Sequence, residues 1–304
     1  MKEERKDQRQ VAVAQVSIIG MIANFLLSIL KFVIGFLCRS QGMMADSMNS
    51  IGDVLASFMS FIGGKISAKP KDEDHPYGHG KAEYIFSLLI SVAMVVAAIE
   101  MFKNALKSLI KAEGLTFSYW LIIICGITIM VKVLLYVYTK NKKKQYPNIL
   151  LTAQAEDHRN DIFVTCGTLV GIVSSCFGWY FVDGIVGCLI SVWIAFVGMK
   201  LFKDAYHVLM DTGITEKQEQ QIRCLLLDME DVIRVDAIRS NPVGQNYVIM
   251  IEIAMNQEKT LAESHKIANK IEKMVIRKIP YVVNAFVHIN PSKKKEKSIK
   301  TKKV

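Results

Sequence analysis

Cysteine is scarce in this chain, and its spacing excludes two kinds of site. The 304 residues include six cysteines, and no two of them show the C-x-x-C spacing of a structural zinc site. Most of them fall in or beside apolar stretches, where a free cysteine behaves as a small hydrophobic residue. We therefore expect neither a disulfide framework nor a zinc finger.

Two further absences narrow the class of protein. No H-E-x-x-H or comparable histidine motif occurs, which argues against an intramembrane metal-dependent hydrolase and predicts that the protein is not an enzyme. The first ten residues are strongly charged, and the apolar run after them is far longer than the core of a signal peptide. We expect no cleavable signal.

The positive charge is concentrated at one end of the chain. Residues 293–304 contain seven lysines against one glutamate, so this tail carries six of the ten net positive charges. Such a charge run predicts a disordered, lysine-rich tail. The remainder is close to neutral for its length and shows no nucleic-acid footprint, so we expect no nucleic-acid partner.

Hydrophobic residues make up 51% of the chain, and the mean hydropathy is positive, as in a membrane protein. Each apolar stretch is long enough to cross about 30 Å of hydrocarbon at about 1.5 Å per residue. We predict a charged N-terminal segment at 1–10 and then an all-α six-helix transmembrane bundle at 11–210. Its expected spans are 12–37, 41–66, 82–108, 116–139, 149–176 and 181–207.

Lysine and arginine are unevenly distributed between the expected loops. The N-terminus, the loop between the second and third spans, and the loop between the fourth and fifth spans are all basic. Basic loops stay on the cytoplasmic side. We therefore predict a multi-pass protein of the cell membrane, embedded in the lipid bilayer with both termini in the cytoplasm.

A soluble domain is expected at 211–292. Thr215 and Gln218 form a capping-box pattern that opens an amphipathic helix. Apolar residues then alternate over 246–255, which is typical of a half-buried strand. The full pattern predicts a small α/β ferredoxin-like domain with the order α-β-β-α-β, located in the cytoplasm. One sheet packed on two helices leaves an open face, so we expect a homodimer.

A short pattern occurs twice inside apolar stretches. Its first copy is Ala45-x-x-x-Asn49-x-x-x-Asp53, and its second is Ala153-x-x-x-Asp157-x-x-x-Asp161. Residues four apart lie on one face of a helix. Ionisable groups at membrane depth are costly and usually line an ion pathway. The two pairs therefore predict a four-oxygen site for a divalent cation in a transporter.

The loop before the third span holds a second candidate metal site. Asp72, His75 and His79 show a plausible metal-ligand spacing, and the intervening Pro76 and Gly78 exclude a regular helix. The alternative is a polar connector whose histidines cap the third helix.

Together these motifs resemble the cation diffusion facilitator family over about residues 10–291. The resemblance implies homodimers that exchange a cytoplasmic divalent metal for protons by alternating access. It places the transport site on Asn49, Asp53, Asp157 and Asp161, and the loop site on Asp72, His75 and His79. It further implies a charge pair between Lys81 and Asp211. The implied ligands of the soluble domain are Asp236, Glu252, His265, His288 and Asn290.

The predicted quartet departs from that of zinc-transporting relatives, which usually include a histidine. Here all four ligands are oxygen, which suits manganese better than zinc, and the quartet also resembles the manganese-exporting branch of the family. His158 is expected to point away from it. We predict a Mn(II)/proton antiporter. Efflux of Zn(II), Fe(II) or Co(II) remains an alternative, as does a membrane-anchored metal sensor.

Overall fold

The computed structural model describes residues 2–37, 41–111, 119–177, 179 and 181–293. Within some helices it describes the backbone of a residue but not its side chain. The chain forms two compact units, one ending at Tyr206 and one beginning at His207, and each is described by itself. The predicted tail beyond residue 293 lies outside the described residues.

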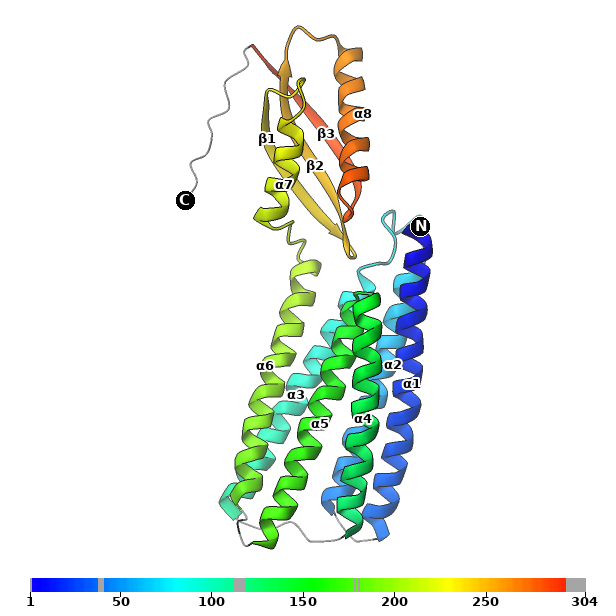
Figure 1. The fold of residues 1–304 in the computed structure, drawn as a ribbon, viewed down its shortest axis with the longest axis vertical. Coiled ribbons are helices and arrows are strands. Elements are labelled where there is room, and N and C mark those ends of the chain that lie inside the picture. The colour runs from blue at the N-terminus through cyan, green and yellow to red at the C-terminus, as the bar shows by residue number, and fades with distance from the viewer. Residues whose placement is uncertain (1, 38–40, 112–118, 178, 180, 294–304) are drawn as a thin grey trace. The chain divides into compact units, whose positions relative to one another are not determined.

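The first unit is a bundle of long helices lying side by side, as Figure 1 shows. The helices agree with the predicted spans, although the predicted start of the fourth span, at 116, lies outside the described residues. The first helix begins earlier than its predicted span because the charged N-terminal residues continue the same helix. The bounds are α1 Lys2–Leu37, α2 Gln41–Ala68, α3 Ala82–Lys111, α4 Tyr119–Gln145, α5 Ile149–Cys176 and α6 Phe181–Leu209.

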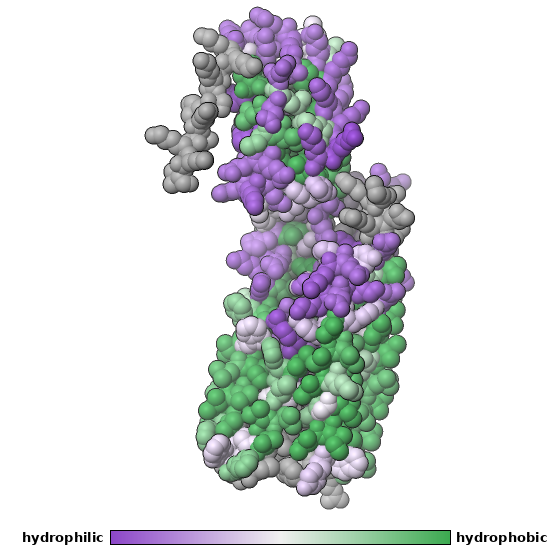
Figure 2. Space-filling view, in the orientation of Figure 1, coloured by the Kyte–Doolittle hydropathy of each residue, from purple (hydrophilic) through white to green (hydrophobic). Residues whose placement is uncertain are grey.

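The outer surface of this unit is largely hydrophobic (Figure 2), with side chains such as Leu26 and Phe196 exposed. Within the described part of the chain, five helices are long and apolar enough to cross a membrane by length and composition, namely α1, α2, α3, α4 and α6. The fifth helix is equally long but more polar. Its buried residues Leu150 and Leu151 pack in the core of the unit, so neighbouring helices shield it.

Polar side chains connect the helices inside the unit. The Gln154 amide of α5 donates hydrogen bonds to Ser17 Oγ of α1 at 2.9 Å and to Ser60 Oγ of α2 at 2.6 Å. The Glu83 carboxylate of α3 pairs with Arg9 of α1 and accepts a hydrogen bond from Ser67 of α2 at 3.0 Å. Hydrogen bonds of this kind hold helices together where lipid removes the hydrophobic drive for association.

The second unit has the predicted α-β-β-α-β order. Its elements are α7 Glu216–Leu227, β1 Arg234–Val243, β2 Asn246–Asn256, α8 Leu261–Lys278 and β3 Val282–Ser292. The strands form one sheet in the order β1-β2-β3, with β1 antiparallel and β3 parallel to β2. Ile249, Ile251 and Ile253 are fully buried and pack with residues of α7 and α8, which confirms the alternation predicted for this strand.

Local chemistry explains where these elements begin and end. Thr215 caps α7 through the predicted capping box with Gln218, and Thr260 caps α8 in the same way. Gly244 lies between β1 and β2 with φ 63°, a left-handed conformation that glycine adopts without a steric penalty. At the end of α6, Asp211 has φ 54°, and the Thr212 N–H bonds to the His207 carbonyl at 2.9 Å, which closes the helix in a Schellman arrangement.

Candidate metal-transport site

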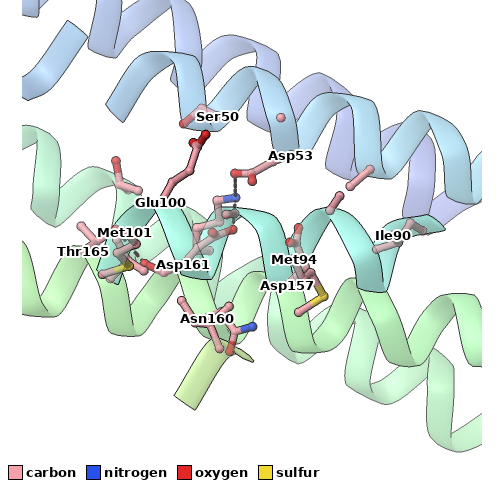
Figure 3. A pocket seen from close by; sticks show the side chains of 18 of the residues that line it. Ser50, Asp53, Ile90, Met94, Glu100, Met101, Asp157, Asn160, Asp161 and Thr165 are labelled. Carbon is pink, nitrogen blue, oxygen red and sulfur yellow. Dashed lines mark hydrogen bonds and ion pairs between the residues drawn. The ribbon is translucent and has the colours of Figure 1, made fainter. Parts of the chain in front are cut away.

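A cavity of about 390 Å³ lies inside the helical unit and holds three of the four predicted transport ligands. Asp53 lies on its α2 side, whereas Asp157 and Asp161 lie one turn apart on the α5 side (Figure 3). The backbone of Asn49 belongs to α2, but its side chain lies outside the described residues. The repeated four-residue offset therefore brings the carboxylates of two helices to one cavity.

Lys132 of α4 occupies the space between these carboxylates. Its ammonium lies 2.8 Å from Asp53 Oδ2 and also pairs with Asp161 Oδ2, and its side chain is only 1% exposed. The sequence interpretation missed this residue. The available signal was a lysine inside an apolar span, since an ionisable residue at membrane depth usually has a function.

The described lining of the cavity carries further charge. Lys31 of α1 donates a hydrogen bond to Ser50 Oγ at 3.2 Å, and Glu100 of α3 contributes a fourth carboxylate. Four carboxylates and two ammonium groups therefore line the cavity, which leaves a formal excess of two negative charges. One divalent cation balances that excess.

His158 lies near the predicted ligands but is not among the residues that line the cavity. Its absence from the lining agrees with the expectation that it points away from the quartet, although one ring nitrogen lies within 4.8 Å of carboxylate oxygens of Asp157 and Asp161. The residue is fully buried, and neither ring nitrogen has a hydrogen-bond partner in the described structure. A Cβ added at Gly20 of α1 would lie 3.7 Å from Cε1 of His158, so the imidazole lies against α1. A nitrogen ligand is thus within reach of an otherwise oxygen-lined site.

The structure also brings together the three predicted loop residues. His75 Nδ1 lies 3.1 Å from Asp72 Oδ1, and His79 Nε2 lies 3.3 Å from Asp72 Oδ2. The backbone N–H of His75 donates a 2.7 Å hydrogen bond to Asp72, which lowers the pKa of that carboxyl below its usual value. Asp72 therefore stays ionised under mildly acidic conditions. The three ligand atoms converge well enough to hold a metal ion.

The predicted ligands of the soluble domain lie less close to one another than the three loop residues do. Asn290 donates a hydrogen bond to Asp236 at 2.9 Å, and Arg239 pairs with Glu252 at 2.8 Å. Glu252 is in register with His288 on the neighbouring strand. In contrast, His265 lies on α8, which packs against the other face of the sheet, and bonds with Asn269. This metal site remains a prediction.

The predicted charge pair joins residues of different units. Lys81 precedes α3 in the first unit, whereas Asp211 follows α6 and belongs to the second unit. The pairing of their side chains remains a prediction.

Comparison with known proteins shows which family this chain belongs to. Residues 17–210 match the cation efflux transmembrane domain, and residues 214–292 match the cytoplasmic domain of cation efflux proteins. The chain is therefore a multi-pass membrane transporter that exports divalent cations and has a cytoplasmic C-terminal domain. It belongs to the cation diffusion facilitator family, as the motifs indicated, and this family consists of transporters rather than enzymes.

Several relatives match along most of their length. Manganese efflux system protein MneP of Bacillus subtilis is 27% identical over 293 residues, covering 93% of this chain and 98% of its own. Manganese efflux system protein MneS of the same organism is 30% identical over 280 residues, covering 92% and 96%. Magnetosome protein MamM of Magnetospirillum gryphiswaldense is 29% identical over 286 residues, covering 93% and 90%.

The cavity geometry makes a first prediction about Asp157. Its carboxylate supplies charge that offsets the lost hydration of a divalent ion, so Asp157→Asn should abolish metal transport into proteoliposomes while leaving the protein folded. Glu156→Gln is the matched control, because Glu156 is the preceding acidic residue on α5 and pairs with Arg159 instead. Full transport by Asp157→Asn would remove this residue from the site.

Proposed function

We propose that this protein exports manganese(II) from the cytoplasm in exchange for protons, with Asn49, Asp53, Asp157 and Asp161 as the transport site. The observation that carries the proposal is the meeting of carboxylates from α2 and α5 at one cavity, whose described lining has an excess of two negative charges. A cation of two positive charges is the complementary substrate.

Ligand chemistry and relatives favour manganese as that cation. Carboxylate and amide oxygens suit manganese, whereas zinc prefers nitrogen and sulfur ligands. Two relatives that match almost end to end are named manganese efflux proteins. The buried imidazole of His158 is the observation that favours zinc, or iron(II) and cobalt(II), as the alternative substrate.

The proposed mechanism is alternating access in a homodimer in the cell membrane, with both termini in the cytoplasm. The soluble domain supports dimerisation because α7 and α8 pack on one face of its sheet, which leaves residues such as Met250 and Phe286 exposed on the other. The loop residues Asp72, His75 and His79 supply an additional metal site near the membrane part. Lys81 and Asp211 would connect the two domains electrostatically.

Proton exchange makes a second prediction. Protons that replace the metal are carried by the carboxylates of the quartet as a coupled set, because the quartet itself has no imidazole. Manganese flux should therefore increase when an imposed pH gradient drives protons in the opposite direction. The measurement is manganese flux in sealed proteoliposomes with the membrane potential clamped, and empty liposomes are the control. A manganese flux that does not change with the pH gradient would contradict antiport.

A third prediction concerns the choice of metal. Asn49→His replaces a neutral carbonyl oxygen with an imidazole nitrogen, which binds zinc more strongly than manganese along the divalent series. The ratio of zinc flux to manganese flux should rise. Asn49→Asp adds charge, so it should strengthen binding of both metals without changing their ratio.

His158→Asn is the companion variant for this experiment, because it removes the imidazole already present near Asp157 and Asp161. Each ratio compares two fluxes through one protein, so differences in expression cancel. If the ratio changes in His158→Asn but not in Asn49→His, then His158 rather than Asn49 sets the metal preference.

A further inference from the structure

We propose that Lys132 is a tethered cation that occupies the transport site in place of the metal and must be displaced when the metal binds. The inference rests on the proposed function, since it takes Asp53 and Asp161 to be metal ligands. It adds a role for a residue of α4, a helix from which no ligand was expected.

The first step of the argument is geometric. Lys132 approaches from α4 and joins a carboxylate of α2 to a carboxylate of α5 through one ammonium group. The dashed contacts in Figure 3 run to Asp53 on one side of the cavity and to Asp161 on the other. The ammonium therefore uses the same oxygens that a metal bridging these helices would use.

The second step concerns competition. A carboxylate oxygen that accepts a hydrogen bond from an ammonium directs one lone pair at that group, and a metal ion at the same position would be strongly repelled by the ammonium. A metal that binds Asp53 and Asp161 must consequently push the ammonium aside. The four-carbon lysine stem has the flexibility for this movement. The cavity of about 390 Å³ supplies space for it.

The third step concerns the empty carrier. When the metal leaves, the carboxylates of Asp53, Asp157 and Asp161 remain together inside the membrane, where uncompensated charge is costly. A tethered ammonium returns to them without having to enter from solution. Lys132 thus lowers the affinity for metal. It also supports the reorientation of the metal-free site to the side of the membrane where the next ion binds, and the two effects can be measured separately.

Equilibrium binding tests the competition. In the purified full-length protein, Lys132→Met removes the charge and keeps the length of the side chain. Its Kd for Mn²⁺, measured by titration calorimetry, should fall by about tenfold or more, because close buried charge pairs couple by at least this factor. Lys132→Arg keeps the charge, and a guanidinium can donate two parallel hydrogen bonds to a carboxylate. The Kd of this variant for Mn²⁺ should therefore rise instead. Lys140→Met is the control, since Lys140 lies on the same helix beside Tyr136 and does not line the cavity.

Transport tests the return step. Metal–metal exchange is followed as uptake of radioactive Mn²⁺ into proteoliposomes loaded with unlabelled Mn²⁺, and it does not require the empty site to reorient. Net uptake into metal-free vesicles does require it. Lys132→Met should retain exchange and lose most of its net transport, whereas Lys140→Met should keep both. A merely structural role for Lys132 would instead lower exchange and net transport together.

The outcomes separate this inference from the proposed function. If Kd for Mn²⁺ is unchanged or higher in Lys132→Met, while Asp157→Asn abolishes binding, the site stands and the tethered cation is overturned. If Asp157→Asn binds Mn²⁺ normally, the site assignment itself is wrong. Should Lys132→Met fail to fold, the arginine variant decides: an unchanged or lower Kd for Lys132→Arg contradicts the competition.

Discussion

Charge inside a membrane needs a counter-charge nearby, and the helical unit is organised around this requirement. Each ionisable group at membrane depth costs on the order of 3 kcal/mol or more when it is left alone. Here Asp53 and Asp161 share the buried ammonium of Lys132, so the expensive groups stabilise one another. The described lining of the same cavity retains a formal excess of negative charge, which is complementary to a cation.

Polar side chains elsewhere in the unit also bond to one another, because the interior of a membrane offers little water to hydrogen-bond them. Gln154 bonds to both Ser17 and Ser60, and Glu83 is buried against Arg9 and Ser67. These contacts connect α1 to α2, α3 and α5, and they place the polar α5 against its neighbours. Asp157 and Asp161 of this helix face the cavity. In the soluble unit, water is available outside, and a conventional apolar core of residues such as Ile251 and Ile271 holds the sheet and helices together.

Most of the fold was predictable because each element carries its own periodic signal. The long apolar stretches predict the helices of the first unit, and the alternation around Ile251 predicts the central strand of the second. The early start of the first helix has a local cause. The first helix starts earlier than predicted because charged residues continue a helix that hydropathy alone would end. A hydropathy scan underrates α5, because this helix carries Asp157 and Asp161, which line the cavity, and the ion pair of Glu156 with Arg159.

By itself, the sequence determined the family and the element order. It also predicted the carboxylates proposed for the transport site, because a spacing of four residues places side chains on one face of a helix. Only the tertiary structure decided which groups from other helices meet those carboxylates. Lys132 comes from α4, Glu100 from α3 and Lys31 from α1, and no spacing along the chain relates them to Asp53 or Asp157. The burial of the His158 ring against α1 was likewise decided by packing between helices. The charge balance of the cavity depends on residues from several helices, and these residues come together only when the chain folds.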